Sequence, residues 1–309
     1  METWIQFIIG ILLIVGGADV LVKGSSALAR RLGLSEFIVG LTVMAIGTST
    51  PELAVSLISA VKGSAGAAVG NVVGSNIFNV FAALGICAVI APVALTGSNM
   101  RRDIPAGVAA AALLLLFKAI GYIPRGAGVA MIVLYTALII YTVRTSRERT
   151  RSDSDSPRMP LLLAVIMIAT GIASLICGGD TFLDSATTLA RHWGMSEAAI
   201  SVTLVAAGTS MPELVSSVVA LCRGKGDMAL GNIIGSNTVN ILVVLGISAA
   251  ARPLSLHDIT LFDLGIMTSG MILIFISAYT FLKRRVDRIE GIIFVAIYVI
   301  YILRNINAI

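Results

Sequence analysis

Two glutamates stand in the middle of apolar segments of this chain, each within a copy of the same short motif. Glu52 lies in AIGTSTPEL at 45–53 and Glu213 lies in AAGTSMPEL at 206–214. A charged side chain at the centre of a bilayer costs at least about 2.5 kcal/mol, so such residues usually face a cavity or a partner. No Lys or Arg accompanies both motifs inside the apolar segments. We therefore expect both acids to have a function.

The residues just before each glutamate add further oxygen atoms. Pro51 and Pro212 cannot donate a backbone hydrogen bond, and Gly47 and Gly208 loosen the backbone. We expect the carbonyls of 45–48 and 206–209 to leave the helical hydrogen-bond pattern. The neighbouring hydroxyls belong to Thr48, Ser49, Thr209 and Ser210. A broken helix at mid-membrane with such oxygens and a carboxylate is typical of a cation site.

A second motif also occurs twice, as GNVVGSNIFN at 70–79 and GNIIGSNTVN at 231–240. Its polar residues recur every four positions and so share one helix face; they are Asn71, Ser75, Asn79, Asn232, Ser236 and Asn240. Hydrogen bonding between helices would explain one such motif. Two copies beside two acidic motifs favour ion ligation.

The ligand types narrow the choice of ion. Two carboxylates with hydroxyl, amide and carbonyl oxygens suit Ca²⁺, which takes 6–8 oxygen ligands, and the hydroxyls and carbonyls also suit Na⁺. The absence of a Cys/His cluster in the sequence argues against zinc or copper, and no organic cofactor is expected. Asp19 and Asp180, two further acids in apolar segments, either line a gating or access path or serve helix ends.

The composition indicates where these motifs sit. The chain has 309 residues, of which 57% are hydrophobic and 13% charged, with a mean hydropathy of +0.96. Soluble proteins carry about 25% charged residues, so we predict a polytopic membrane protein whose partners are the lipid bilayer and the transported cations. The net charge of +5 then reflects membrane topology, and no nucleic-acid partner is expected.

Ten apolar segments predict an all-α protein with ten transmembrane helices. The segments are 4–22, 37–61, 67–92, 104–121, 126–143, 160–177, 198–221, 228–251, 261–282 and 289–307. We expect a first five-helix repeat at 1–143, a hydrophilic linker at 144–160 and a second repeat at 161–309.

The internal repeat is the more informative feature. Residues 17–53 align with 178–214 at a constant offset of 161 without a gap, and 16 of the 37 positions are identical. Because each half has five spans, the second half must enter the membrane in the opposite orientation. Two inverted five-helix repeats are characteristic of secondary transporters.

Loop charges predict the orientation. The loops on the side of the linker hold 16 of the 22 Lys and Arg residues, which makes that side cytoplasmic. Both termini should then lie outside, in a bacterial-type cytoplasmic (inner) membrane.

The paired motifs GTSTPEL with GTSMPEL, and GNVVGSN with GNIIGSN, resemble the two repeats of the cation/calcium exchanger superfamily, and within it the prokaryotic sodium/calcium exchangers. The resemblance covers nearly the whole chain. It implies ten helices, one central ion cluster, and alternating access by sliding of the first and sixth helices.

The resemblance also implies ligand roles. Glu52 and Glu213 would bind both Ca²⁺ and Na⁺, and Thr48 and Thr209 would complete the calcium site. One flanking sodium site would be lined by Ala45, Ser49 and Ser75, and its mate by Ala206, Ser210 and Ser236. Asn79 would sit at the centre. Several family members have Asp where this chain has Asn240, which leaves the stoichiometry and any proton or potassium coupling open.

We therefore predict a Na⁺/Ca²⁺ antiporter, not an enzyme. A proton-coupled or K⁺-dependent exchanger is the first alternative, because a proton can compete for the same carboxylates. An ion channel is the second. An intramembrane hydrolase would need a nucleophile–base pair, and no His lies in an apolar segment. The sequence leaves the oligomeric state and the direction of transport open.

Overall fold

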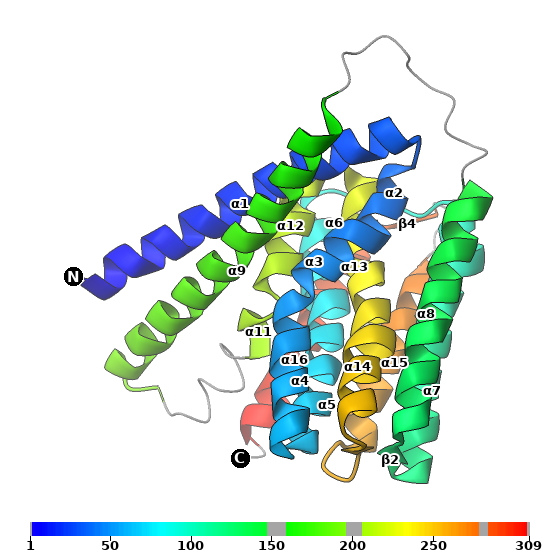
Figure 1. Ribbon diagram of the computed structural model, residues 1–309. Coiled ribbons are helices and arrows are strands. Elements are labelled where there is room, and N and C mark those ends of the chain that lie inside the picture. Colours follow the sequence, from blue (N-terminus) through cyan, green and yellow to red (C-terminus); the bar gives the residue numbers. More distant parts are fainter. Residues whose placement is uncertain (1, 147–158, 196–205, 278–283, 308–309) are drawn as a thin grey trace.

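The computed structural model describes residues 2–146, 159–195, 206–277 and 284–307, and these are almost entirely helical (Figure 1). Two long helices, α1 (Glu2–Leu32) and α9 (Leu161–His192), lie side by side and form an arm along one flank of the molecule. We call the end where α8 ends and α9 begins the linker end. Of the predicted linker at 144–160, residues 147–158 lie outside the described part.

The first acidic motif lies in a helix that is broken, as predicted. Its parts are α2 (Glu36–Val39), the π-helical turn η1 (Gly40–Met44), α3 (Ala45–Thr48) and α4 (Thr50–Lys62). The axis bends by 46° at Ser49, where the missing N–H of Pro51 interrupts the helix. In the second half, the same place is taken by α11 (Ala206–Gly208) and α12 (Met211–Cys222), again with a proline at the start of the second helix.

The second motif lies in two central helices that are the most buried apolar helices of the described chain. One runs through α5 (Ala65–Ile77), η2 (Phe78–Leu84) and α6 (Gly85–Ile90). The other runs through α13 (Gly226–Val239), η6 (Asn240–Val244) and α14 (Leu245–Ala251). In each helix a π-helical turn begins at or next to the last asparagine of the motif, Asn79 or Asn240. The sequence did not predict these turns.

Outer helices and two small sheets complete the fold. The helices are η3 (Asn99–Asp103) continuing into α7 (Ile104–Ile120), α8 (Arg125–Ser146), α15 (Leu261–Ser277) and α16 (Arg288–Asn307). Strand β1 (Val93–Ala94) pairs antiparallel with β4 (Arg285–Val286), and β2 (Tyr122–Ile123) pairs antiparallel with β3 (Leu254–Ser255). Each small sheet therefore ties a loop of the first half to a loop of the second.

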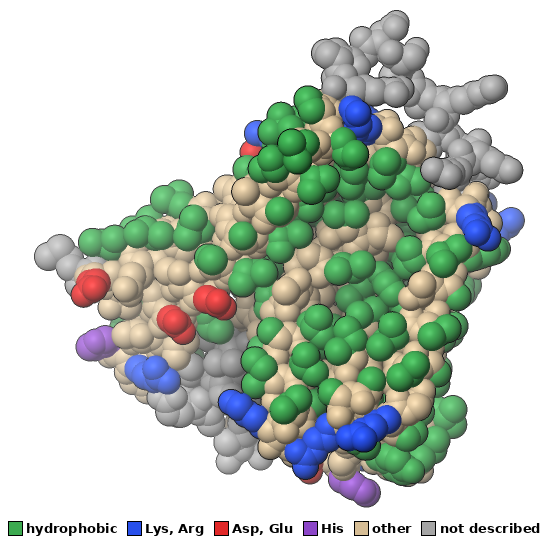
Figure 2. Space-filling model, viewed as in Figure 1, with side chains coloured by type: hydrophobic (Ala, Val, Ile, Leu, Met, Phe, Trp, Pro, Cys, Tyr) green, Lys and Arg blue, Asp and Glu red, His purple; other side chains and the backbone are tan. Residues whose placement is uncertain are grey.

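The surface agrees with a membrane environment. Figure 2 shows hydrophobic side chains over the middle of the helices and Lys and Arg towards the two ends. In the described chain, seven helices are long and apolar enough to cross a membrane, or eight with the bent pair α2–α4, and Met211–Cys222 and Leu261–Ser277 are shorter apolar helices. The spans predicted at 198–221 and 261–282 include residues outside the described part.

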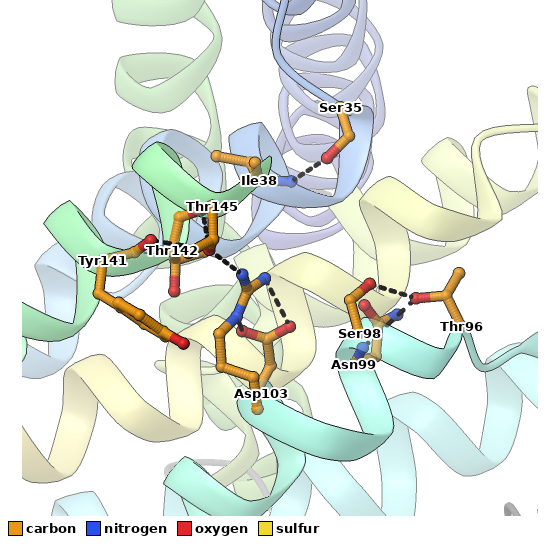
Figure 3. A network of polar contacts seen from close by, with 10 residues as sticks. Ser35, Ile38, Thr96, Ser98, Asn99, Asp103, Tyr141, Thr142 and Thr145 are labelled. Atoms are coloured by element: carbon orange, nitrogen blue, oxygen red, sulfur yellow. Dashed lines mark hydrogen bonds and ion pairs between the residues drawn. The ribbon is translucent and has the colours of Figure 1, made fainter. Parts of the chain in front are cut away.

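A polar network joins α7 and α8 at the linker end (Figure 3). Arg102 donates from Nε to Asp103 Oδ1 at 2.8 Å and from a terminal nitrogen to Oδ2 at 3.1 Å. Its other terminal nitrogen donates to the hydroxyl of Thr145 at 2.8 Å. Asp103 is buried, and this bidentate pairing with Arg102 compensates its charge. The network thus fixes the start of α7 against the end of α8.

Small residues allow α1 and α9 to approach closely. A Cβ atom added at Gly17 would lie 2.9 Å from the carbonyl oxygen of Gly171 and 2.8 Å from Ser174 Cβ. Aromatic contacts between Phe7 and Phe182, with ring centroids 5.1 Å apart, join the far end of the same pair. This close packing holds α1 and α9 together along their length.

We predict that Gly17→Ala destabilises the protein, because the added methyl group meets backbone atoms of α9 that cannot move aside. The thermal midpoint in detergent should fall by about 3 °C or more, as expected for overpacking of about 1–3 kcal/mol. Gly16→Ala is the matched control, since nothing lies within 4 Å of its added Cβ. An equal effect of the two substitutions would contradict close packing at Gly17.

Candidate cation site

Glu52 and Glu213 lie in the first turns of α4 and α12, and both are fully buried. Each carboxylate is held by a serine of the other half. Ser210 Oγ donates to Glu52 Oε1 at 2.9 Å, and Ser49 Oγ donates to Glu213 Oε1 at 3.0 Å. The break in each motif thus places one residue of each half against the acid of the other. The helix N-termini also favour negative charge at these positions.

The central helices add a second hydroxyl to each carboxylate. Ser75 Oγ donates to Glu52 Oε1 at 3.3 Å, and Ser236 Oγ donates to Glu213 Oε1 at 3.4 Å. The other oxygen, Oε2, of both glutamates is buried and has no hydrogen-bond partner among the described residues. No ion pair recorded for the described residues involves either acid. Two oxygens are therefore available to a cation.

Two amides position the glutamates through their backbones. Asn71 Nδ2 donates to the carbonyl of Glu52 at 3.2 Å and to Ser56 Oγ at 2.9 Å. Asn232 Nδ2 correspondingly donates to the carbonyl of Glu213 at 3.4 Å and to Ser217 Oγ at 3.0 Å. The sequence placed both asparagines on the right helix face. It did not indicate that they bind the glutamate backbone, nor that the two serines take part.

The remaining predicted ligands are not arranged symmetrically. Thr48 Oγ1 donates to Asn232 Oδ1 at 3.3 Å and lies 3.4 Å from Ser236 Oγ. Its mate Thr209 has a buried hydroxyl with no partner among the residues that the structure describes. Asn79 is buried and neither of its amide atoms has a partner in the described part of the chain, whereas Asn240 donates to Asn76 Oδ1 at 3.1 Å and leaves only its own Oδ1 unpaired there. The hydroxyl of Thr48 thus contacts residues of the other repeat, whereas the hydroxyl of Thr209 contacts no polar atom of the described residues.

A cavity lies beside Thr209. It has a volume of about 160 Å³ and runs between α4, α9, α11 and α12, with Thr209 and Asp180 among its lining residues. Asp19, the mate of Asp180, instead forms an ion pair with Lys23 at 2.7 Å and another with Arg223. Neither aspartate contacts the glutamates, so the structure places both of them outside the central cluster.

The donor set fits a hard cation. The central cluster offers carboxylate, hydroxyl and amide oxygens, which are ligands for Ca²⁺ and Na⁺. The carbonyl of Ala45 stays in the helical pattern, contrary to expectation, because it accepts the N–H of Ser49 at 3.0 Å; the hydroxyl of Thr48 lies 3.5 Å away. Ala206 begins α11. Within the described residues no group of three or more His, Cys, Asp or Glu side chains forms a metal cluster.

Comparison with known proteins identifies the family. The model of the family described as "Sodium/calcium exchanger protein" matches residues 2–144 and 163–307. The chain is a member of the sodium/calcium exchanger family. It therefore belongs to a family of membrane transporters, which agrees with the resemblance seen in the sequence motifs.

Relatives support the same assignment. The chain is 31% identical over 340 residues to the sodium/calcium exchanger MaX1 of Methanosarcina acetivorans, covering 96% of each chain. It is 35% identical over 263 residues to the inner membrane protein YrbG of Escherichia coli, covering 80% of this chain and 79% of that one. A solved structure of the sodium-calcium exchanger NCX_Mj superposes with a TM-score of 0.85, at 29% identity and 98% coverage of both chains.

We predict that Ser49→Ala and Ser210→Ala weaken Ca²⁺ binding by about tenfold each. Each change removes a hydroxyl that contacts a buried carboxylate, and a hydrogen bond to a charged group contributes about 1.5 kcal/mol. Titration calorimetry of the purified protein measures the effect. Thr50→Ala is the control, because its exposed hydroxyl donates to the carbonyl of Ile46 in α3 and does not contact either carboxylate. Unchanged binding in both serine variants would exclude the serines from the site.

Proposed function

We propose that the protein exchanges Na⁺ for Ca²⁺ across the membrane at a central site built on Glu52 and Glu213. The observation that carries the proposal is the crossed arrangement of the two acids. Each buried carboxylate is held by hydroxyls from both repeats, and no basic side chain in the described part pairs with either. Such a charge in a membrane interior requires a cation to compensate it.

Competition for the same oxygens would produce exchange. Two ionised carboxylates carry a charge of −2, which one Ca²⁺ or two Na⁺ ions balance. Either ion set must then leave before the other binds. We assign flanking Na⁺ ligands to Ala45, Ser49 and Ser75 in one half, and to Ala206, Ser210 and Ser236 in the other. Thr48 and Thr209 would complete the Ca²⁺ site.

Asn240 bears on the stoichiometry. It contributes an amide and no charge, and it is anchored by Asn76, whereas Asn79 has no partner among the described residues and would face the ions. If a third Na⁺ moves in each cycle, that cycle carries net charge, and moving one charge through 100 mV contributes about 2.3 kcal/mol.

Alternating access would follow from the inverted repeat. We propose ten spans in two five-helix repeats at 1–143 and 161–309. Thr48 is hydrogen-bonded to the other repeat, and a cavity lies at Thr209. These two features support a state in which the ion site opens at the end opposite the linker. In the other state the roles of the two threonines would be exchanged.

We predict that replacing both Glu52 and Glu213 with Gln abolishes Ca²⁺ uptake driven by a Na⁺ gradient, because the neutral amides cannot balance a divalent cation. The assay is ⁴⁵Ca uptake into proteoliposomes. Asp258→Asn, a change at an exposed loop acid, should retain wild-type uptake. Full transport by the double variant would refute the proposed site.

The same liposomes distinguish the coupling ions when Na⁺, K⁺ and H⁺ gradients are imposed separately. Uptake with the Na⁺ gradient alone supports the proposal. Uptake with only a pH gradient identifies a proton-coupled exchanger. A Ca²⁺ flux that needs no counter-ion and does not saturate with concentration identifies a channel.

We also propose that the chain lies in a bacterial-type inner membrane with both termini outside and the 144–160 linker in the cytoplasm. Alkaline phosphatase fused after Asn307 should be active in bacterial cells, because this enzyme folds only outside the cytoplasm. The same reporter inserted within the linker should be inactive. The reverse pattern would invert the proposed topology.

A further inference from the structure

Ion pairs tie the arm to the rest of the protein at the linker end. Asp19 of α1 pairs with Lys23 one turn along its own helix, 2.7 Å away, and with Arg223 at the end of α12. Two residues further, Lys225 pairs with Glu36 at the start of α2. The turn at 223–225 is therefore bound to both α1 and α2.

The symmetry-related residues at the other end have the matching chemistry but are apart. At the offset of 161, Asp19 corresponds to Asp180 and Arg223 corresponds to Lys62. Asp180 lines the open cavity, and Lys62 is exposed in the last turn of α4. No ion pair is recorded for either residue within the described part of the chain.

The charges around Asp180 differ from those around Asp19 in one respect. The position of Lys23 is taken by Asp184, one turn after Asp180 on α9. Like charges one turn apart repel each other, so a cation that reaches Asp180 relieves this repulsion. Figure 2 shows acidic side chains on the α1–α9 arm, and a row of Lys and Arg side chains at the lower rim below α4 and α14.

We propose that Asp19–Arg223 and Asp180–Lys62 are two alternate latches, of which one is closed whenever the site opens at the opposite end. This inference rests on the proposed alternating access. In the state described here the linker-end latch is closed and the cavity is open at Asp180. Closing the cavity would bring α9 against α4, pair Asp180 with Lys62, and release Asp19 from Arg223.

The packing of the arm explains why the latches would alternate. Because α1 and α9 are joined along their length by close glycine contacts and by Phe7 with Phe182, they move as one body. A movement of the arm that closes one end therefore opens the other. Leu183 of α9 packs against Gly208, and Ile172 packs against Gly47. The arm therefore contacts both helix breaks that precede the glutamates.

The test measures which end is open, without relying on transport. In a background in which Cys87, Cys177 and Cys222 are replaced by Ser, a single cysteine at Ala54, which lines the cavity, reports access from outside. A membrane-impermeant thiol reagent is applied to right-side-out vesicles. A cysteine at the exposed His257 is the control, and its labelling should be the same in every variant.

Asp19→Asn and Arg223→Gln should each slow labelling at position 54 by about two- to fivefold, as expected for the loss of a partly exposed ion pair. Arg223→Lys keeps the charge and should label at the wild-type rate. Adding Asp180→Asn to Asp19→Asn should restore labelling towards that rate, because both end states then lack their latch. Lys62→Gln should act as Asp180→Asn does.

Two results would overturn the proposal. One is wild-type labelling in Asp19→Asn and Arg223→Gln. The other is slowed labelling that Asp180→Asn leaves uncorrected. The ⁴⁵Ca assay separates this proposal from the proposed function, because loss of Na⁺-driven uptake in the wild type with the labelling pattern intact would refute only the choice of ions.

Discussion

Two carboxylates buried in an apolar interior, with no basic partner among the described residues, are the constraint on which the structure depends. Their oxygens accept hydrogen bonds from serine hydroxyls instead, and each hydroxyl must come from a defined place. Pro51 and Pro212 break their helices so that each acid lies at a helix start, where the dipole favours it. The same breaks direct Ser49 and Ser210 across to the opposite repeat. Neither half can therefore complete its site alone.

Much of this arrangement could be predicted because polar residues in an apolar chain have few alternative explanations. The helix breaks follow from Gly and Pro chemistry, and the shared helix face of Asn71, Ser75 and Asn79 follows from helix periodicity. The placement of Ser75 in the ion site came only from the resemblance to the family. The pairing of each serine with the glutamate of the other half could not be predicted from the sequence. The pairing depends on how the two repeats face each other in space. The constant offset of 161 shows only which residues of the two repeats correspond.

Other features depend on packing that sequence patterns do not encode. The π-helical turns in the central helices have no signature in local residue preference. The contacts of Asn71 and Asn232 with the glutamate backbones require two helices to be placed within hydrogen-bond distance. The difference between Thr48 and Thr209 breaks the symmetry of the two repeats. Two copies of the same motif cannot predict it, because they predict the same contacts for both threonines.

The π-helical turns bear on the symmetry of the two halves. A π-helical turn accommodates one extra residue, which rotates the following helix face by about 100° relative to the preceding one. Ser75 and Asn79 precede or begin this rotation in one half, and Ser236 and Asn240 do so in the other. The offset of 161 nevertheless holds without a gap through both motifs. Both halves therefore change helical register beside the last asparagine of their motif.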